Sequence, residues 1–292
     1  MVQFVQQLIN GVSLGCIYAL IALGYTMVYG IVRLINFAHG DVYMVGAYIG
    51  YSIALVMGPR FIPALIAAMV GAAALGMIVE KLAYRPLRYA PRITSLTTAI
   101  GVSLFLQNAV RKFISPNFLA FPDLITRVTW EIGGLTLSNV QVFVPIVAIF
   151  LVILLQWVVQ KTKPGKAMRA VSLDKDCAQL MGVNVDRVIS TTFALGSALA
   201  AAGGVLVGIA YPRIDPCMGV MAGLKAFVSA VLGGIGIIPG AALGGLFMGL
   251  AEVMAVHFIN SAFKDAVAFV ILIVVLLVKP SGLLGKHASE KV

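Results

Sequence analysis

The chain has 292 residues, of which 61% are hydrophobic and only 11% are charged, and its net charge is +10. Soluble globular domains carry about 25% charged residues, so this polar surface is too sparse to cover a water-soluble body. The composition therefore excludes an ordinary soluble protein and indicates many membrane spans, because apolar residues are distributed along the whole chain.

Apolar stretches long enough to cross a bilayer, about 20 residues each, recur along the chain. We expect spans at residues 5–29, 41–57, 62–80, 94–114, 140–160, 188–210, 222–238, 241–259 and 263–279. The seventh is short and ends in a glycine-rich segment, so it is either a re-entrant half-helix or a true crossing. The predicted fold class is all-α: one polytopic transmembrane helical bundle over residues 1–292, with eight or nine membrane segments, of which one or more can be broken or re-entrant.

Lysine and arginine placement predicts the orientation. The first basic residue is Arg33, so we expect the first apolar stretch to be a retained span rather than a signal peptide. Basic tracts lie at 81–92, 161–187 and 279–291, and nine crossings place all three on one side. The positive-inside rule makes that side cytoplasmic, with a periplasmic N-terminus and a cytoplasmic C-terminus. The basic residues lie in short loops, which argues against nucleic-acid binding.

Two polar segments are long: an external loop at 115–139 and a cytoplasmic loop at 161–187. The second contains SLDKDCAQLMGVNVDRV, from Ser172 to Val188. Its apolar residues recur at the spacing of one helix face, namely Leu173, Cys177, Leu180 and Met181. Ser172 can cap the start of this helix, and Gly182 can supply a left-handed residue at its end. We expect one helix over 172–182, which either connects two spans or contacts another subunit.

Asp176-Cys177-Ala178, followed after three residues by Gly182, resembles the EAA---G element of importer permeases in the ATP-binding cassette class. Asp replaces Glu, Cys replaces the first Ala, and the downstream I-x-L-P is absent. NGVSLGCIYALIALGYTMVYG, INFAHGD, RAVSLDKDCAQLMGVNVDRVI, GLKAFVSAVLGGIGIIPGA and KPSGLLG are similar to the LivH-type permeases of high-affinity branched-chain amino-acid importers. The resemblance extends over about residues 4–286.

The resemblance implies a bacterial inner (cytoplasmic) membrane protein that works with partners. These are a second, LivM-type permease, two ATPase subunits and a periplasmic substrate-binding protein. It also implies that the 172–182 helix is the coupling helix that contacts an ATPase. The candidate contact residues are Leu173, Asp176, Cys177, Ala178, Leu180, Met181 and Gly182.

The chain has no phosphate-binding loop of its own. Gly165-Lys166 and Gly285-Lys286 are its GK pairs, and neither is followed by Ser or Thr. We therefore expect no cofactor in this chain, with ATP and Mg bound by the partner subunits. Three cysteines and three histidines lie in separate regions, so no catalytic residue and no metal site is predicted, and the chain is not expected to be an enzyme.

Several residues are candidates for the translocation path. Asn36, His39 and Gly40 form either a helix break inside the membrane or a cytoplasmic turn in which Asp41 caps the second span. The glycines of GGIGIIPG form either a gate or a tight hairpin. They are Gly233, Gly234 and Gly236.

Charged residues near the last spans are less clear from the sequence. Glu252 lies deep in an apolar stretch, where it pairs with a cation, lines the path or is neutral. We expect the remaining charges of this region to lie in external loops: Asp215, Lys225, Lys264 and Asp265. Small residues four apart predict close helix packing, within the chain or against the second permease, at Gly11/Gly15, Gly46/Gly50, Gly204/Gly208, Gly240/Gly244 and Gly245/Gly249.

The sequence therefore predicts the permease subunit of an ATP-driven importer of Leu, Ile or Val. The same machinery carrying other neutral amino acids, amides or urea is an alternative. A stand-alone ion-coupled carrier would need paired acids or a charged relay inside its spans, and only Glu252 and Asp41 qualify.

Overall fold

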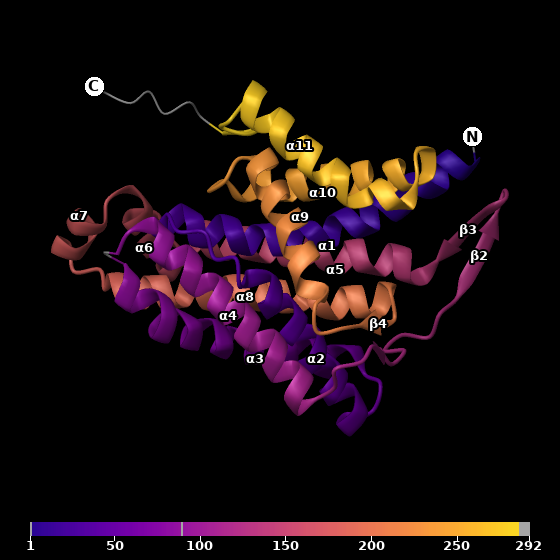
Figure 1. Ribbon diagram of the computed structural model, residues 1–292, viewed down its shortest axis with the longest axis horizontal. Coiled ribbons are helices and arrows are strands. Elements are labelled where there is room, and N and C mark those ends of the chain that lie inside the picture. The colour runs from indigo at the N-terminus through magenta and orange to yellow at the C-terminus, as the bar shows by residue number, and fades with distance from the viewer. Residues whose placement is uncertain (1, 89, 286–292) are drawn as a thin grey trace.

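The computed structural model describes residues 2–88 and 90–285 and is a helical bundle, which confirms the all-α class (Figure 1). Its α-helices are α1 (Val2–Val32), α2 (His39–Met57), α3 (Phe61–Val79), α4 (Arg92–Phe113), α5 (Asn139–Lys161), α6 (Lys163–Leu173), α7 (Lys175–Leu180), α8 (Val185–Ala210), α9 (Met218–Gly233), α10 (Ile238–Phe258) and α11 (Lys264–Val278). Short turns of π- and 3-10 helix are η1 (Glu80–Tyr84), η2 (Arg85–Leu87) and η3 (Ser261–Phe263).

The strands are short and lie between helices: β1 (Leu119–Ala120), β2 (Thr129–Ile132), β3 (Leu135–Ser138) and β4 (Arg213–Ile214). β1 pairs antiparallel with β4, and β2 pairs with β3 in a hairpin. The hairpin turn is Gly133-Gly134, and both residues have a positive φ, as a two-residue hairpin turn requires. The hairpin and the start of α1 lie at one end of the bundle, and α7 lies at the other (Figure 1).

All nine expected spans are helices. Within the described residues, eight helical segments are long and apolar enough to cross a membrane, and α9 is the shorter ninth. Its 16 residues span about 24 Å, less than the roughly 30 Å of a bilayer core. α9 starts and ends earlier than expected, because Gly234 leaves the helical conformation with φ +104°.

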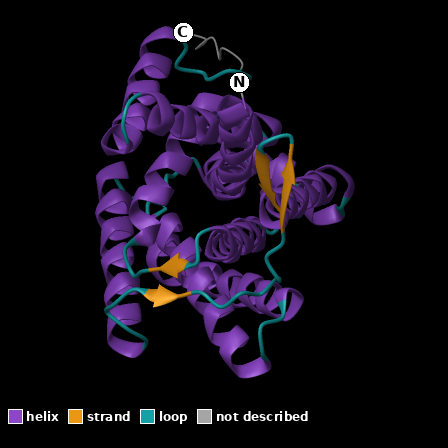
Figure 2. Ribbon diagram, turned by 90° about the vertical axis from the view of Figure 1, so that its right-hand side faces the viewer, coloured by secondary structure: helices purple, strands orange, loops and turns teal. Residues whose placement is uncertain are grey.

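The bundle is built around α1. In its most apolar window 89% of α1 is buried by the rest of the protein, against 6% for the segment that contains α11. The second value indicates an outer helix whose apolar side chains face lipid or another subunit. Viewed from the hairpin end, most helices are seen nearly end-on (Figure 2).

Two of the predicted small-residue pairs pack against one another. Gly249 of α10 lies against the backbone of Gly15 and Gly11, and Gly15 lies against Leu246 and Gly245. Without water to drive helix association, such close backbone approach is what holds membrane helices together. The pairs Gly11/Gly15 and Gly245/Gly249 therefore join α1 to α10 within this chain.

α2 and α9 both begin inside the bundle, each after a non-helical segment (residues 33–38 and 211–217). His39, the first residue of α2, lies beside Gly24 of α1, two turns and about 12 Å before that helix ends. Gly40 of α2 lies directly against Gly219 of α9. The starts of two helices thus meet in the interior.

Of the two alternatives for this segment, the cytoplasmic turn in which Asp41 caps α2 is wrong. Residue Ala38 precedes α2 and makes no side-chain cap. Asp41 is 1% exposed and accepts a hydrogen bond from Gln107 Nε2 of α4 at 3.0 Å. A carboxylate enclosed in this way needs a donor from a neighbouring helix, because no water reaches it.

Candidate functional site

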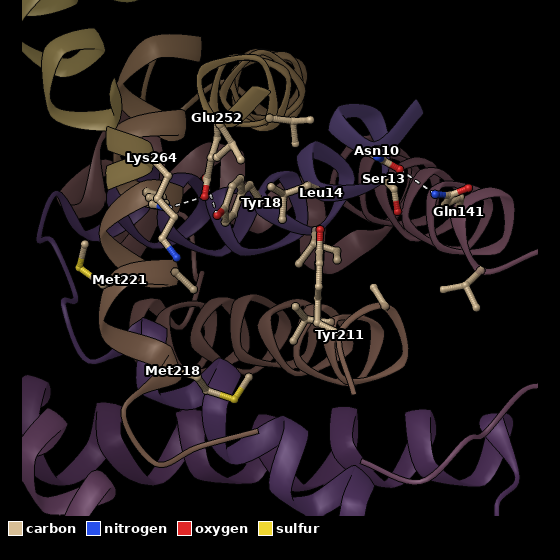
Figure 3. A pocket seen from close by; sticks show the side chains of 18 of the residues that line it. Asn10, Ser13, Leu14, Tyr18, Gln141, Tyr211, Met218, Met221, Glu252 and Lys264 are labelled. Carbon is tan, nitrogen blue, oxygen red and sulfur yellow. Dashed lines mark hydrogen bonds and ion pairs between the residues drawn. The ribbon is translucent and has the colours of Figure 1, made fainter. Parts of the chain in front are cut away.

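A cavity of about 880 Å³ opens among α1, α5, α8, α9 and α10, on the side of the β2–β3 hairpin. Its outer part is polar. Asn10, Ser13 and Gln141 lie on its wall, and Gln141 Nε2 donates to Asn10 Oδ1 at 2.7 Å (Figure 3). A cavity of this size and lining accepts a small polar solute.

The cavity ends at a group of three charged side chains and one tyrosine that we call the floor cluster: Tyr18, Lys225, Glu252 and Asp265. Lys225 Nζ lies 2.6 Å from Glu252 Oε1 and 2.7 Å from Asp265 Oδ1. The Tyr18 hydroxyl donates to Glu252 Oε2 at 2.8 Å (Figure 3). Tyr18 is half-way along α1, so the floor cluster lies near the middle of the bundle.

The floor cluster corrects one sequence expectation. Lys225 was expected to be an external loop charge, but it belongs to α9 and is only 4% exposed. Asp265, also expected in a loop, is in the first turn of α11 and reaches the same lysine. Lys225 lies within the predicted span 222–238, so the rule that ionisable groups in spans are functional candidates could have identified it.

Beneath the floor cluster the bundle is closed. The Gly40–Gly219 contact lies there, with the His39 ring 4.8 Å from that of Tyr25. The ring of Phe227 lies 6.0 Å from Tyr25, measured between centroids. This packing separates the cavity from the α7 end of the bundle.

The predicted path residues fall in three places. Glu252 lines the cavity, whereas Asn36, His39 and Gly40 are buried beneath it. Asn36 Oδ1 accepts hydrogen bonds from Tyr84 Oη at 2.7 Å and from the Ala38 amide at 3.1 Å. The structure does not bring these residues into one site with Glu252.

The glycine segment after α9 lies further along, towards the α7 end. Gly233 packs against the backbone of Gly240, and Gly234 and Gly236 have φ of +104° and +96°. This is a tight hairpin between α9 and α10. Gly236 also borders a separate cavity of about 110 Å³ beside Met168 of α6.

The α7 end differs from the predicted single helix over 172–182. The chain breaks at Asp174, whose φ of −151° and ψ of 118° are extended, so α6 ends and α7 begins there. Asp174, not Ser172, caps α7: its Oδ1 accepts from the amides of Asp176 and Cys177, both at 2.9 Å. These amides, chiefly that of Cys177, lower the pKa of Asp174 because they stabilise the carboxylate.

The predicted contact residues in and beside α7 are mostly uncovered. Leu173, Leu180 and Met181 are 85%, 87% and 85% exposed, whereas Ala178 is buried against the bundle. Asp176, Cys177 and Gly182 are exposed as well, and Gly182 has the expected positive φ of +83°. Exposed apolar side chains that group together are typical of protein–protein or membrane interaction sites.

Ion pairs fix the helices near α7. Arg88 contacts both Glu80 of η1 and Asp186 of α8, and Arg85 also contacts Asp186. The Ser190 hydroxyl donates to Glu80 Oε2 at 2.6 Å. Because Glu80 is fully buried, these partners are what allow its charge to remain there. The pairs connect the end of α3 to the start of α8.

Comparison with known proteins now identifies the family. Residues 7–276 match the family model described as "Branched-chain amino acid transport system / permease component". The chain belongs to this family. It is 45% identical to the high-affinity branched-chain amino acid transport system permease protein LivH of Escherichia coli, over 99% of this chain and 98% of the relative. It is 43% identical to the corresponding permease protein BraD of Pseudomonas aeruginosa, with the same coverage.

A solved structure shows the same fold at greater distance. It is described as PsaBC from Streptococcus pneumoniae in complex with Fab, with a TM-score of 0.50, 12% identity, and coverage of 95% of this chain and 92% of that one. The family is one of transport permeases, and the helical bundle with its candidate membrane spans fits a polytopic membrane protein.

Proposed function

We propose that this chain is the permease subunit of an ATP-binding-cassette importer that takes up branched-chain amino acids, and that the cavity is its part of the path. The carrying observation is the arrangement along the bundle: a solute-sized cavity stops half-way, closed packing follows, and a short helix flanked by exposed apolar side chains lies at the far end. An importer that alternates its access needs these three parts in this order. The substrate class rests on the relatives' names.

The placement of charge supports an orientation in which the cavity faces the periplasm. Arg85 and Arg88 bond Asp186 at the start of α8, and Lys175 of α7 reaches the carbonyl oxygen of Val32 at the end of α1. Basic residues from separate tracts thus meet at the α7 end, which the positive-inside rule makes cytoplasmic. The N-terminus is then periplasmic, and the cavity opens to a periplasmic binding protein.

The proposed partners follow from the need for other subunits that bind and hydrolyse ATP. α7 offers Leu180 and Met181 to a groove of an ATPase subunit, and two such subunits, a second LivM-type permease and a binding protein complete the importer. ATP and Mg are bound by the ATPase subunits. Hydrolysis moves α7, and the ion pairs of Arg88 carry that movement to α3 and α8.

Uptake in proteoliposomes that contain the whole importer tests the coupling assignment. Leu180→Asp places a charge on the exposed apolar surface of α7, so ATP-driven leucine uptake should be lost while the chain still inserts. Phe113→Asp is the matched control, because Phe113 is 85% exposed and is the last residue of α4, which does not pack against α7. Equal uptake by the wild type and Leu180→Asp would contradict the assignment.

A substrate panel tests the substrate class. Uptake of leucine, isoleucine and valine should exceed that of urea and simple amides by the same importer. Uptake of urea or amides without any uptake of leucine would replace the proposed substrate with the alternative one.

A further inference from the structure

We propose that the floor cluster is a binding station for the zwitterionic head of a free amino acid, with the substrate's carboxylate on Lys225 and its ammonium between Glu252 and Asp265. The inference rests on the proposed function and adds the site at which the chain holds the substrate between the binding protein and the cytoplasm. No single helix builds it, since α1, α9, α10 and α11 each contribute one side chain.

The charge balance of the floor cluster favours an incoming ammonium. Two carboxylates share one lysine, so the cluster carries a net negative charge when empty. The Lys225 side chain is 5% exposed and that of Glu252 is 10%, whereas that of Asp265 is 36% exposed and faces the cavity. An ammonium that approaches through the cavity reaches Asp265 first, and it can take the place of Lys225 beside the two acids when the substrate's carboxylate pairs with that lysine.

Exchange of ion pairs lets a zwitterion enter without leaving a charge unpaired. Separation of Lys225 from Glu252 would be costly at this depth if nothing replaced either partner. An amino acid replaces both at once, because its carboxylate takes the lysine and its ammonium takes the acids. Tyr18 holds the far oxygen of Glu252, which fixes the carboxylate's direction during the exchange.

The surroundings fit an apolar side chain. Leu14 and Ile17 of α1 and Met218, Met221 and Ala222 of α9 line the same cavity. Other charged groups also line the cavity, and Lys264 directly precedes Asp265 in α11. Arg127 bonds Asp123 at 3.2 Å, Arg213 lies over the Phe118 ring at 3.5 Å, and Lys264 lines the wall.

Binding at the floor cluster acts on the helix that closes the path below it. Lys225 ties α9 to α10 through Glu252 and to α11 through Asp265, and the start of the same helix forms the Gly40–Gly219 contact. A substrate that takes over these ion pairs weakens the attachment of α9. The station therefore connects substrate binding to the opening of the path.

Binding of radiolabelled leucine to the detergent-solubilised importer, without its binding protein, tests the station directly. Leucine should bind, and 4-methylpentanoate and 3-methylbutylamine, which each lack one of the two charges, should not compete. Lys225→Met should weaken leucine binding by about tenfold or more, as expected for loss of a hydrogen bond between charged groups. Lys112→Met, which removes an exposed charge of α4 that does not line the cavity, should leave binding unchanged.

A triple variant without these charges distinguishes a role of the floor cluster in substrate binding from a purely structural role of its ion pairs. Lys225→Met with Glu252→Gln and Asp265→Asn removes all three charges and so leaves no unpaired ion to disturb folding. If the station binds the zwitterion, this variant inserts and assembles with its ATPases but neither binds nor takes up leucine. Wild-type uptake in the triple variant, or undiminished leucine binding in Lys225→Met, would overturn the inference.

The two proposals fail in different ways. Binding of alanine without any binding of leucine would contradict the branched-chain substrate and support the zwitterion station. Leucine uptake by the wild-type importer, with no binding of any amino acid to the solubilised complex, would support the proposed function and overturn the station.

Discussion

The starts of α2 and α9 have the same local structure but different roles. Each follows a non-helical segment that contains an Ile-Asx pair, Ile35-Asn36 and Ile214-Asp215. In each, the Asx oxygen accepts the amide two residues later, from Ala38 at 3.1 Å and from Cys217 at 2.8 Å. The helix starts one residue after that amide, and its second residue is the glycine that meets its counterpart.

The helices that lead into these starts run in opposite directions. Gly24 of α1 lies against Gly196 of α8, whereas Ile17, earlier in α1, lies near Gly203, later in α8. The two units therefore enter the bundle from opposite ends and meet at Gly40 and Gly219. Inverted units that meet near the middle of the membrane are a recurring plan of transporters.

The difference between the two starts appears one and a half turns further on. α2 has Gly46, which packs against Ala201 of α8, at the position where α9 has Lys225. At this position α2 thus packs closely against α8, whereas α9 places a charged side chain at the cavity. The same local structure therefore forms closed packing in α2 and a polar site in α9, because a glycine stands at this position in α2 and a lysine in α9.

The contact between the two starts should be the most sensitive point. A Cβ at Gly219 would collide with the backbone of Gly40, which cannot move aside. Gly219→Ala should therefore greatly reduce the yield of folded protein. Gly101→Ala is the control, because a Cβ there meets open space, and its yield should equal that of the wild type. Size-exclusion chromatography of the solubilised chain measures both.

Thiol labelling should distinguish the open start from the sealed one. Met221 and Val42 occupy matching positions, and they are 38% and 1% exposed. In a variant whose native cysteines are replaced, Met221→Cys should react with a water-soluble maleimide and Val42→Cys should not. Equal labelling of the two cysteines would show that the start of α2 is as open to water as that of α9.

The two Asx residues should differ in their contribution to stability. Asn36→Ala leaves the buried Tyr84 hydroxyl without its acceptor and should cost about 1–3 kcal/mol. Asp215→Ala removes only the bond to the Cys217 amide and should lower the stability less. Thermal unfolding in detergent gives the order. A larger loss of stability in Asp215→Ala than in Asn36→Ala would contradict the conclusion that the start of α2 is the more closely packed of the two.

α7 is a surface helix, so loss of the cap at its start should have a smaller effect on stability than the substitutions at the starts of α2 and α9. Asp174 caps α7 with a lowered pKa, so its stabilising contribution is complete above the ordinary pKa of the carboxyl, about 4. The contribution is lost as the pH falls through the lowered value. The protection of the α7 amides, taken as their exchange rate relative to the intrinsic rate at the same pH, should therefore fall in acid in the wild type. In Asp174→Ala exchange should be raised at neutral pH already, and a flat profile in both would contradict the cap.

Local sequence signals determined much of this protein. Apolar stretches predicted the helices at all nine expected spans, because a bilayer demands about 20 apolar residues for each crossing. Gly182 marked the end of α7, since few other residues adopt a positive φ readily. The break at Asp174 was missed, because Ser172 and Asp174 are both capping residues and only the surroundings choose between them.

Only the tertiary structure decided where the charges lie. Lys225 and Asp265 are forty residues of chain apart and looked like loop residues, yet they share an ion pair at the end of a cavity. Nothing local encodes this, because an ion inside a membrane bundle is stable only when distant helices supply its partners. The same holds for Gly40 and Gly219, whose role as the meeting point of two helix starts exists only once both units have folded into the bundle.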